Sequence, residues 1–124
     1  MNEKIKSFTD LTTWQEGHNL VLMTYKCIES FPKKENFAIT PQMQRCAISI
    51  TSNVAEGFSR KSSKEKIQFY YISLGSLTEL HNQLIIAKGL NYISEEKFNE
   101  IIDQLKKVQR LLNGLIKSAK ILNT

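Results

Sequence analysis

Apolar residues recur every three or four positions in four stretches of the chain, which is the spacing of one face of a helix. The stretches run from about residue 9 to 30, from 41 to 59, from 63 to 90 and from 95 to 122. No stretch alternates apolar and polar residues as a half-buried strand would. Short links between helices of this length predict an all-α, antiparallel up-down-up-down four-helix bundle, with residues 1–124 forming a single domain.

Residues that start or stop helices set the predicted boundaries. The Phe-Pro pair at 31–32 ends the first helix, because the residue before proline disfavours the helical region. Thr40 is expected to cap the second helix, with Pro41 at its first position, where a missing N–H costs nothing. Ser62 and Glu65 have the spacing of a capping box for the third helix.

More apolar residues are present than one bundle seam needs. The core stripe predicted for the first helix consists of Leu11, Trp14, His18, Val21, Tyr25 and Ile28, and that of the fourth of Ile101, Leu105, Val108, Leu112, Leu115, Ala119 and Leu122. Other large apolar residues lie off the predicted stripes: Leu20, Leu22, Phe69, Tyr71, Ile72, Leu80, Ile85, Ile86, Ile102, Leu111 and Ile116. This surplus predicts a second apolar surface that meets other subunits.

The run 49–60 is unusually polar for a helix of a bundle. Ile50, Val54 and Phe58 form an apolar stripe at every fourth residue. A second stripe is polar and partly ionic, and its members are Arg45, Ser49, Ser52, Asn53, Glu56 and Arg60. We interpret Asn53, Glu56 and Arg60, together with Glu79, as a structural polar network that joins the second and third helices or neighbouring subunits.

Positive charge is concentrated in the middle of the chain. The 17 Lys and Arg residues outnumber the 12 Asp and Glu residues, which gives a formal net charge of +5. Residues 32–66 carry seven positive and three negative charges. No apolar run approaches the ~20 residues of a membrane span, and the first residues lack the apolar core of a secretory signal. We therefore expect a cytoplasmic protein without a membrane partner, whose Cys27 and Cys46 are reduced.

The predicted turn between the second and third helices is a candidate phosphate-binding surface. Arg60, Lys61, Lys64 and Lys66 fall within seven residues, beside a helix N-terminus whose free N–H groups suit phosphate. Arg45, on the polar stripe of the second helix, is the fifth candidate contact. A solvated charged turn without a ligand explains the same residues equally well.

Metal and catalytic sites are not expected. His18 and His81 lie on different predicted helices, and neither belongs to a Glu-x-x-His pair of the kind that binds metals in bundles. Glu56 and Glu79 could pair as acid and base, but Glu56 precedes Arg60 by four residues, the favourable order for a helix salt bridge. We expect no catalytic residue and no cofactor.

Several motifs resemble those of the 23S rRNA intervening-sequence proteins, a four-helix-bundle family, over nearly the whole chain. They are Phe8-Thr9-Asp10-Leu11 with Trp14-Gln15, Tyr25, Phe31-Pro32, Gln44-Arg45, the run from Ser49 to Gly57 with Arg60, and Gly75-Ser76-Leu77-Thr78-Glu79-Leu80 with Gln83-Leu84. The resemblance implies a homopentameric barrel of bundles. The accessory variability determinant proteins of diversity-generating retroelements, basic pentamers that bind nucleic acid and a reverse transcriptase, are similar. This chain departs from the pattern at Gly17, where Ala is common, and at His81-Asn82, where Glu-Thr is common.

The residues and the resemblance together predict a non-catalytic, self-associating helical bundle that binds RNA or DNA through a basic surface. The alternative is a protein-interaction scaffold, for example for a polymerase or reverse transcriptase, with no direct nucleic-acid role.

Overall fold

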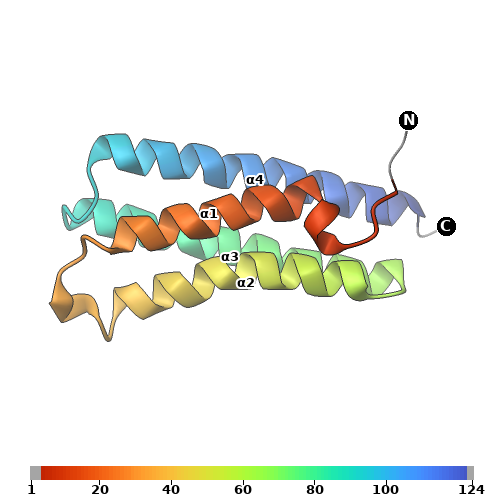
Figure 1. Cartoon of the computed structure of the whole chain (residues 1–124), viewed down its shortest axis with the longest axis horizontal. Coiled ribbons are helices and arrows are strands. Elements are labelled where there is room, and N and C mark those ends of the chain that lie inside the picture. The colour runs from red at the N-terminus through yellow and green to blue at the C-terminus, as the bar shows by residue number, and fades with distance from the viewer. Residues whose placement is uncertain (1–3, 123–124) are drawn as a thin grey trace.

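The computed structural model describes residues 4–122 and is helical throughout, with no strand in that range. Four helices, α1 (Thr12–Ile28), α2 (Ile39–Ser59), α3 (Ser63–Gly89) and α4 (Glu95–Leu122), are accompanied by the short 3-10 turns η1 (Phe8–Asp10) and η2 (Lys33–Glu35). Figure 1 shows the helices side by side along the long axis of the molecule. Each of α1 and α3 packs against both α2 and α4. The predicted antiparallel four-helix bundle is confirmed.

The connections between the helices lie at two opposite ends of the bundle. The α1–α2 connection, which contains η2, lies at the same end as the α3–α4 connection (Figure 1). The α2–α3 turn lies at the opposite end, with the beginning of α1 and the end of α4. Segments that are far apart in sequence therefore share the end that carries the α2–α3 turn.

The core runs the length of the bundle and follows the predicted α4 stripe closely. Fully buried side chains include Leu20, Met43, Ile50, Leu77, Leu84, Leu105 and Leu112. Most of the α4 residues expected in the core are buried, whereas Leu115 is half-buried and Leu122 is exposed. The regular repeat of apolar positions along α4 therefore identifies most of its core face.

The buried face of α1 differs from the predicted one. Thr13, Gly17, Leu20, Thr24 and Ile28 are buried, whereas Trp14, Val21 and Tyr25 are only half-buried and His18 is exposed. A Cβ atom at Gly17 would lie 3.1 Å from Thr51 Cγ2 on α2, so glycine lets the two helices approach closely. Small side chains thus face the core, and His18 instead stacks on Trp14 with a ring separation of 5.0 Å.

Part of the predicted apolar surplus is used inside the bundle. Leu20, Leu80, Ile102 and Ile116 are buried, so their assignment to a second apolar surface was wrong. Each helix buries a face wide enough to contact two neighbours, which is broader than the narrow seam assumed from sequence. Of the remaining surplus, Tyr71, Ile72, Ile85 and Ile86 are exposed on α3 and Leu22 is exposed on α1, whereas Phe69 and Leu111 are half-buried.

Two predicted helix starts also change. α1 is preceded by η1, whose Ser7 and Asp10 form a reciprocal capping box. α2 begins at Ile39 rather than Pro41, and Thr40 does not cap it. Pro41 is tolerated because it still lies in the first turn, where N–H groups have no intrahelical acceptor.

Within residues 4–122, no helix combines the length and the hydropathy needed to cross a membrane.

Candidate nucleic-acid interface

The α2–α3 turn is short and tightly capped. Arg60 has an extended backbone (φ −73°, ψ 150°) and ends α2. The Ser62 hydroxyl then accepts a hydrogen bond from the Glu65 N–H at 3.1 Å, which caps α3. Lys61 and Lys64 therefore lie one on each side of the Ser62 cap.

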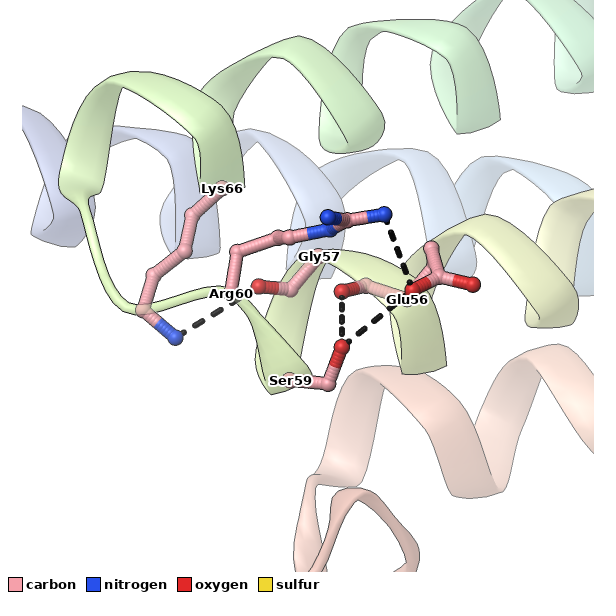
Figure 2. Close-up of polar contacts among 5 residues, drawn as sticks. All are labelled: Glu56, Gly57, Ser59, Arg60 and Lys66. Carbon is pink, nitrogen blue, oxygen red and sulfur yellow. Dashed lines mark hydrogen bonds and ion pairs between the residues drawn. The ribbon is translucent and has the colours of Figure 1, made fainter.

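Arg60 is largely engaged within the protein. Its guanidinium forms an ion pair with Glu56 at 3.3 Å and lies 4.6 Å from the centre of the Phe69 ring. Figure 2 shows this pair beside Ser59, whose hydroxyl donates to the backbone oxygen of Glu56 at 2.7 Å. The ion pair is about half exposed, so it contributes only about 0.3–0.5 kcal/mol. Arg60 thus orders the end of α2 and keeps part of its charge available to solvent.

Lys66 caps the end of α2 from the first turns of α3. Its ammonium donates to the Phe58 carbonyl oxygen at 2.7 Å and to the Gly57 carbonyl oxygen at 3.4 Å. In Figure 2 its side chain reaches back toward α2. Burial lowers the pKa of the ammonium. The carbonyl groups at a helix C-terminus lack intrahelical donors, so this contact stabilises the turn. The Lys66 ammonium is therefore engaged within the protein and is no longer a candidate phosphate contact.

Lys61 and Lys64 are the two candidate residues of the turn that are fully available to a ligand. Both side chains are exposed. Among residues 4–122, the ion pairs formed by lysine involve only Lys88, Lys97 and Lys107. Both ammonium groups are therefore free to contact phosphate.

Arg45 does not belong to the same surface patch. It lies 15 residues before Arg60 on α2, which is about 22 Å along a helix that rises ~1.5 Å per residue. Its side chain is exposed beside a pocket between α2 and α3. The five residues predicted to bind nucleic acid therefore divide into a turn group, a capping lysine and a remote arginine.

The end of α4 adds basic residues that the sequence analysis did not select. Lys117 and Lys120 are exposed in the last turns of α4, and the Lys120 ammonium donates to the Tyr71 hydroxyl on α3 at 3.0 Å. Because α4 runs antiparallel to α3, both lysines lie at the end of the bundle that carries the α2–α3 turn (Figure 1). We call Lys61, Lys64, Lys117 and Lys120 the basic end. Only the antiparallel topology could have revealed this grouping.

The four residues of the predicted polar network fall into separate groups. Asn53 donates to the backbone and hydroxyl oxygens of Ser49 at 2.8 and 3.0 Å, and the hydroxyls of Ser49 and Ser76 lie 2.8 Å apart. Glu79 accepts a long contact from the Cys46 thiol at 3.7 Å. Glu56 and Arg60 form an ion pair with each other, further along α2 than Asn53. The hydrogen bonds that join α2 to α3 here thus involve Ser49, Ser76 and Cys46, and Glu79 is the member of the predicted network that reaches across by hydrogen bonding.

Within residues 4–122, no group of three or more His, Cys, Asp or Glu side chains is arranged to hold a metal ion. Cys46 is buried, and its thiol donates to the Ser76 carbonyl oxygen at 3.0 Å. Burial, reinforced by the nearby Glu79 carboxylate, raises the pKa of the Cys46 thiol to about 12. The thiol therefore acts as a neutral hydrogen-bond donor.

The fold and this surface define the class of protein, which is an all-helical bundle with basic residues at one end. Residues 9–114 match the family model of the 23S rRNA-intervening sequence proteins, and the chain belongs to that family. A solved structure from Bacteroides thetaiotaomicron, described as a protein of unknown function from the S23 ribosomal protein family, has a similar fold, with a TM-score of 0.76 at 21% sequence identity. The superposition covers 86% of this chain and 99% of that one. No protein with a curated description matches the sequence significantly.

Proposed function

We propose that the protein is a non-catalytic, self-associating bundle that binds the phosphate backbone of RNA or DNA through its basic end. The observation that carries this proposal is the exposure of Lys61 and Lys64 in a capped turn, at the same end of the bundle as the exposed Lys117 and Lys120 of α4. Clustered ammonium groups attract polyanions by releasing condensed counterions, which requires no base-specific contact. The family description, which refers to 23S rRNA, supports RNA as the ligand to test first.

The proposed self-association uses the outer face of α3. Ile72, Gly75, Glu79, Asn82 and Ile86 follow one another at steps of three and four, and all are exposed. We call these five residues the α3 seam, because this spacing is typical of packing against another helix. A Cβ atom at Gly75 would meet nothing within 4 Å, which leaves room for a second backbone. A homopentamer is the assembly that the family resemblance implies.

Fluorescence anisotropy with labelled single-stranded RNA tests the binding. Replacing Lys61 and Lys64 together with Ala should weaken binding about tenfold or more, because two phosphate contacts are lost. The matched control replaces Lys33 and Lys34, which are also exposed but lie in η2 at the opposite end. Equal loss of affinity in both double variants would show that only net charge matters, and would contradict the proposal that the basic end binds the phosphate backbone.

The second candidate is a scaffold that binds another protein, such as a polymerase or reverse transcriptase, through the exposed apolar residues of α3. The half-exposed Ile72 and Ile85 favour it, because isolated bundles seldom expose several large apolar side chains on one helix. Purification with and without nuclease separates the candidates. A protein partner retained after nuclease treatment favours the scaffold, whereas a partner lost with the nucleic acid favours direct binding by the basic end.

Catalysis is tested on the same RNA. Glu56 is the residue that an RNA-cleaving activity would most plausibly use, and it is held by Arg60 and Ser59. We expect no cleavage product from the wild-type protein. A product that disappears in the Glu56→Gln variant would contradict the non-catalytic assignment.

A further inference from the structure

A stack of aromatic side chains at the beginning of α1 is not used by the proposed contact with phosphate. The imidazole ring of His18 lies nearly parallel to the indole ring of Trp14, with ring centres 5.0 Å apart and planes inclined by 12°. The Phe8 ring of η1 meets the indole edge to face, with ring centres 5.3 Å apart. His18 follows Trp14 by four residues, so the two side chains lie one turn apart on the same face of α1.

His18 is the exposed member of this stack. Phe8 and Trp14 are half-buried, whereas His18 is exposed. Within residues 4–122, His18 forms no hydrogen bond or ion pair, and its ring contact is with Trp14. The imidazole therefore rests on a packed indole and keeps surface that a further planar ring can cover. Because the stack orders this ring before any ligand binds, it reduces the entropy that binding costs.

The stack lies toward the end of the bundle that carries the basic end. Figure 1 shows η1 and the beginning of α1 at the end with the α2–α3 turn. A Cβ atom at Gly17, the residue before His18, would lie 3.1 Å from Thr51 on α2. Thr51 precedes the last residue of α2 by eight residues, about 12 Å at ~1.5 Å per residue. A single strand of a few nucleotides spans this distance, since its phosphates are spaced by about 3.4 Å or more.

Aromatic rings closer to the α2–α3 turn are less accessible to a base. The Arg60 guanidinium lies 4.6 Å from the centre of the Phe69 ring, and the Lys66 ammonium lies 5.3 Å from that of Phe58. Tyr70 is buried. The stack on α1 is therefore the better candidate for a contact with a base.

Acidic groups near the stack are engaged within the protein. The Asp10 carboxylate accepts hydrogen bonds from two backbone N–H groups that precede η1, at 2.9 and 3.0 Å. The Glu16 carboxylate accepts from the side chain of Gln104 at 2.9 Å and forms an ion pair with Lys107 at 3.5 Å. These carboxylates therefore oppose the approach of a phosphate chain less than free ones would.

We propose that the His18 ring, held by Trp14, stacks on an unpaired base of the nucleic acid whose phosphates contact the basic end. Histidine is among the side chains on which the bases of single-stranded RNA stack. Every base has a flat π-face, so this contact requires no particular sequence. The inference rests on the proposed function and deepens it, because it assigns a single strand as the ligand. The bases of a duplex are already stacked on each other.

An abasic oligomer separates the base contact from the phosphate contacts. In fluorescence anisotropy, the wild-type protein should bind a labelled uridine oligomer at least about fivefold more tightly than an abasic ribose-phosphate oligomer of the same length. Equal affinity for the two oligomers would overturn the inference. Binding of the abasic oligomer tests the basic end by itself, because replacing Lys61 and Lys64 should weaken it whether or not His18 contacts a base. The proposed function and the inference thus fail separately.

His18→Leu is the main variant, because leucine still covers Trp14 but has no planar face. This variant should bind the uridine oligomer only as tightly as the abasic one, with the affinity for the abasic oligomer unchanged. His18→Phe restores a planar ring and should bind both oligomers as the wild type does. The matched control is Phe37→Leu, which removes a 98% exposed aromatic ring from the opposite end of the bundle and should change neither affinity.

Three results with these variants would overturn the inference. They are wild-type affinity of His18→Leu for the uridine oligomer, an equal loss of affinity in Phe37→Leu, and failure of His18→Phe to retain the preference for the uridine oligomer. A merely structural role of His18 in α1 would lower the melting temperature of His18→Leu without changing the ratio of the two affinities. That result would also contradict the inference.

Trp14 supplies a direct spectroscopic readout, because it is the only tryptophan of the chain. Its emission should change on saturation with the uridine oligomer and stay constant on saturation with the abasic oligomer. The midpoint of the emission change should agree with the affinity measured by anisotropy. Unchanged emission at saturation with the uridine oligomer would show that the base does not bind at the stack.

Discussion

At the scale of single residues, Gly57 determines how closely α2 and α3 meet beside the candidate interface. A Cβ atom there would lie 2.6 Å from Cε1 and 2.8 Å from Cδ1 of the buried Tyr70 ring. Gly57→Ala should therefore destabilise the protein by about 1–3 kcal/mol, because a packed ring must move. Urea denaturation measures the change.

Gly114 provides the matched control for Gly57. It also lies in a helix, but a Cβ atom there would meet nothing within 4 Å. Gly114→Ala should stabilise the protein by up to about 1 kcal/mol through helix propensity. Stabilisation by both substitutions would show that the contact between Gly57 and Tyr70 is looser than the structure indicates.

Cys46 should give the protein a distinctive pH dependence. Burial and the Glu79 carboxylate raise the pKa of this thiol from 9.0 to about 12 in the folded state. The unfolded chain therefore loses this proton first, so the free energy of unfolding should fall as the pH rises from about 9 toward 12. Cys46→Ala should show a shallower fall over this range, and parallel curves for the two proteins would contradict the assignment.

At the scale of helices, Lys66 links the end of α2 to the start of α3. Lys66→Met keeps the aliphatic stem but removes the hydrogen bonds to the Phe58 and Gly57 carbonyl oxygens. We expect a loss of about 1 kcal/mol in the free energy of unfolding, with RNA affinity reduced less than in Lys61→Met. The opposite order of effects on RNA affinity would identify Lys66 as a phosphate contact.

The sequence was a good guide to the helices where a single apolar stripe dominates. The repeat in α4 identified most of its buried residues, and Ser62 predicted the start of α3 correctly. The prediction of the buried face was wrong for α1. That face contains the small residues Thr13, Gly17 and Thr24, whereas the larger Trp14 is only half-buried. Hydrophobicity alone cannot indicate a face where small side chains allow two helices to approach closely.

At the scale of the whole molecule, association through α3 has a direct test. Replacing Ile72 and Ile86 with Glu should place two charges in the α3 seam and reduce the assembly to single chains of 14.3 kDa. The matched control replaces Leu22 and Ile48, which are similarly exposed on α1 and α2. Sedimentation velocity measures the masses. A wild-type protein that sediments as a single chain would contradict the self-association proposal.

The sequence indicated the candidate interface only in part. Lys61 and Lys64 were found because they are close together in sequence, and both are exposed. Lys117 and Lys120 were not selected, because they are far from Lys61 and Lys64 in sequence and only the antiparallel order of the helices brings the end of α4 to the end that carries the α2–α3 turn. The pocket between α2 and α3 beside Arg45 was not predicted, since its lining depends on which face of α3 meets α2.

The salt dependence of RNA binding tests the central claim most directly. The logarithm of the binding constant for single-stranded RNA should fall linearly with the logarithm of salt concentration, with a slope of about −0.7 for each phosphate neutralised. Replacement of Lys61 and Lys64 with Ala should make this slope shallower by about 1.4, whereas replacement of Lys33 and Lys34 should leave it unchanged. An identical slope for the wild type and the Lys61 and Lys64 variant would show that the basic end does not contact the RNA backbone.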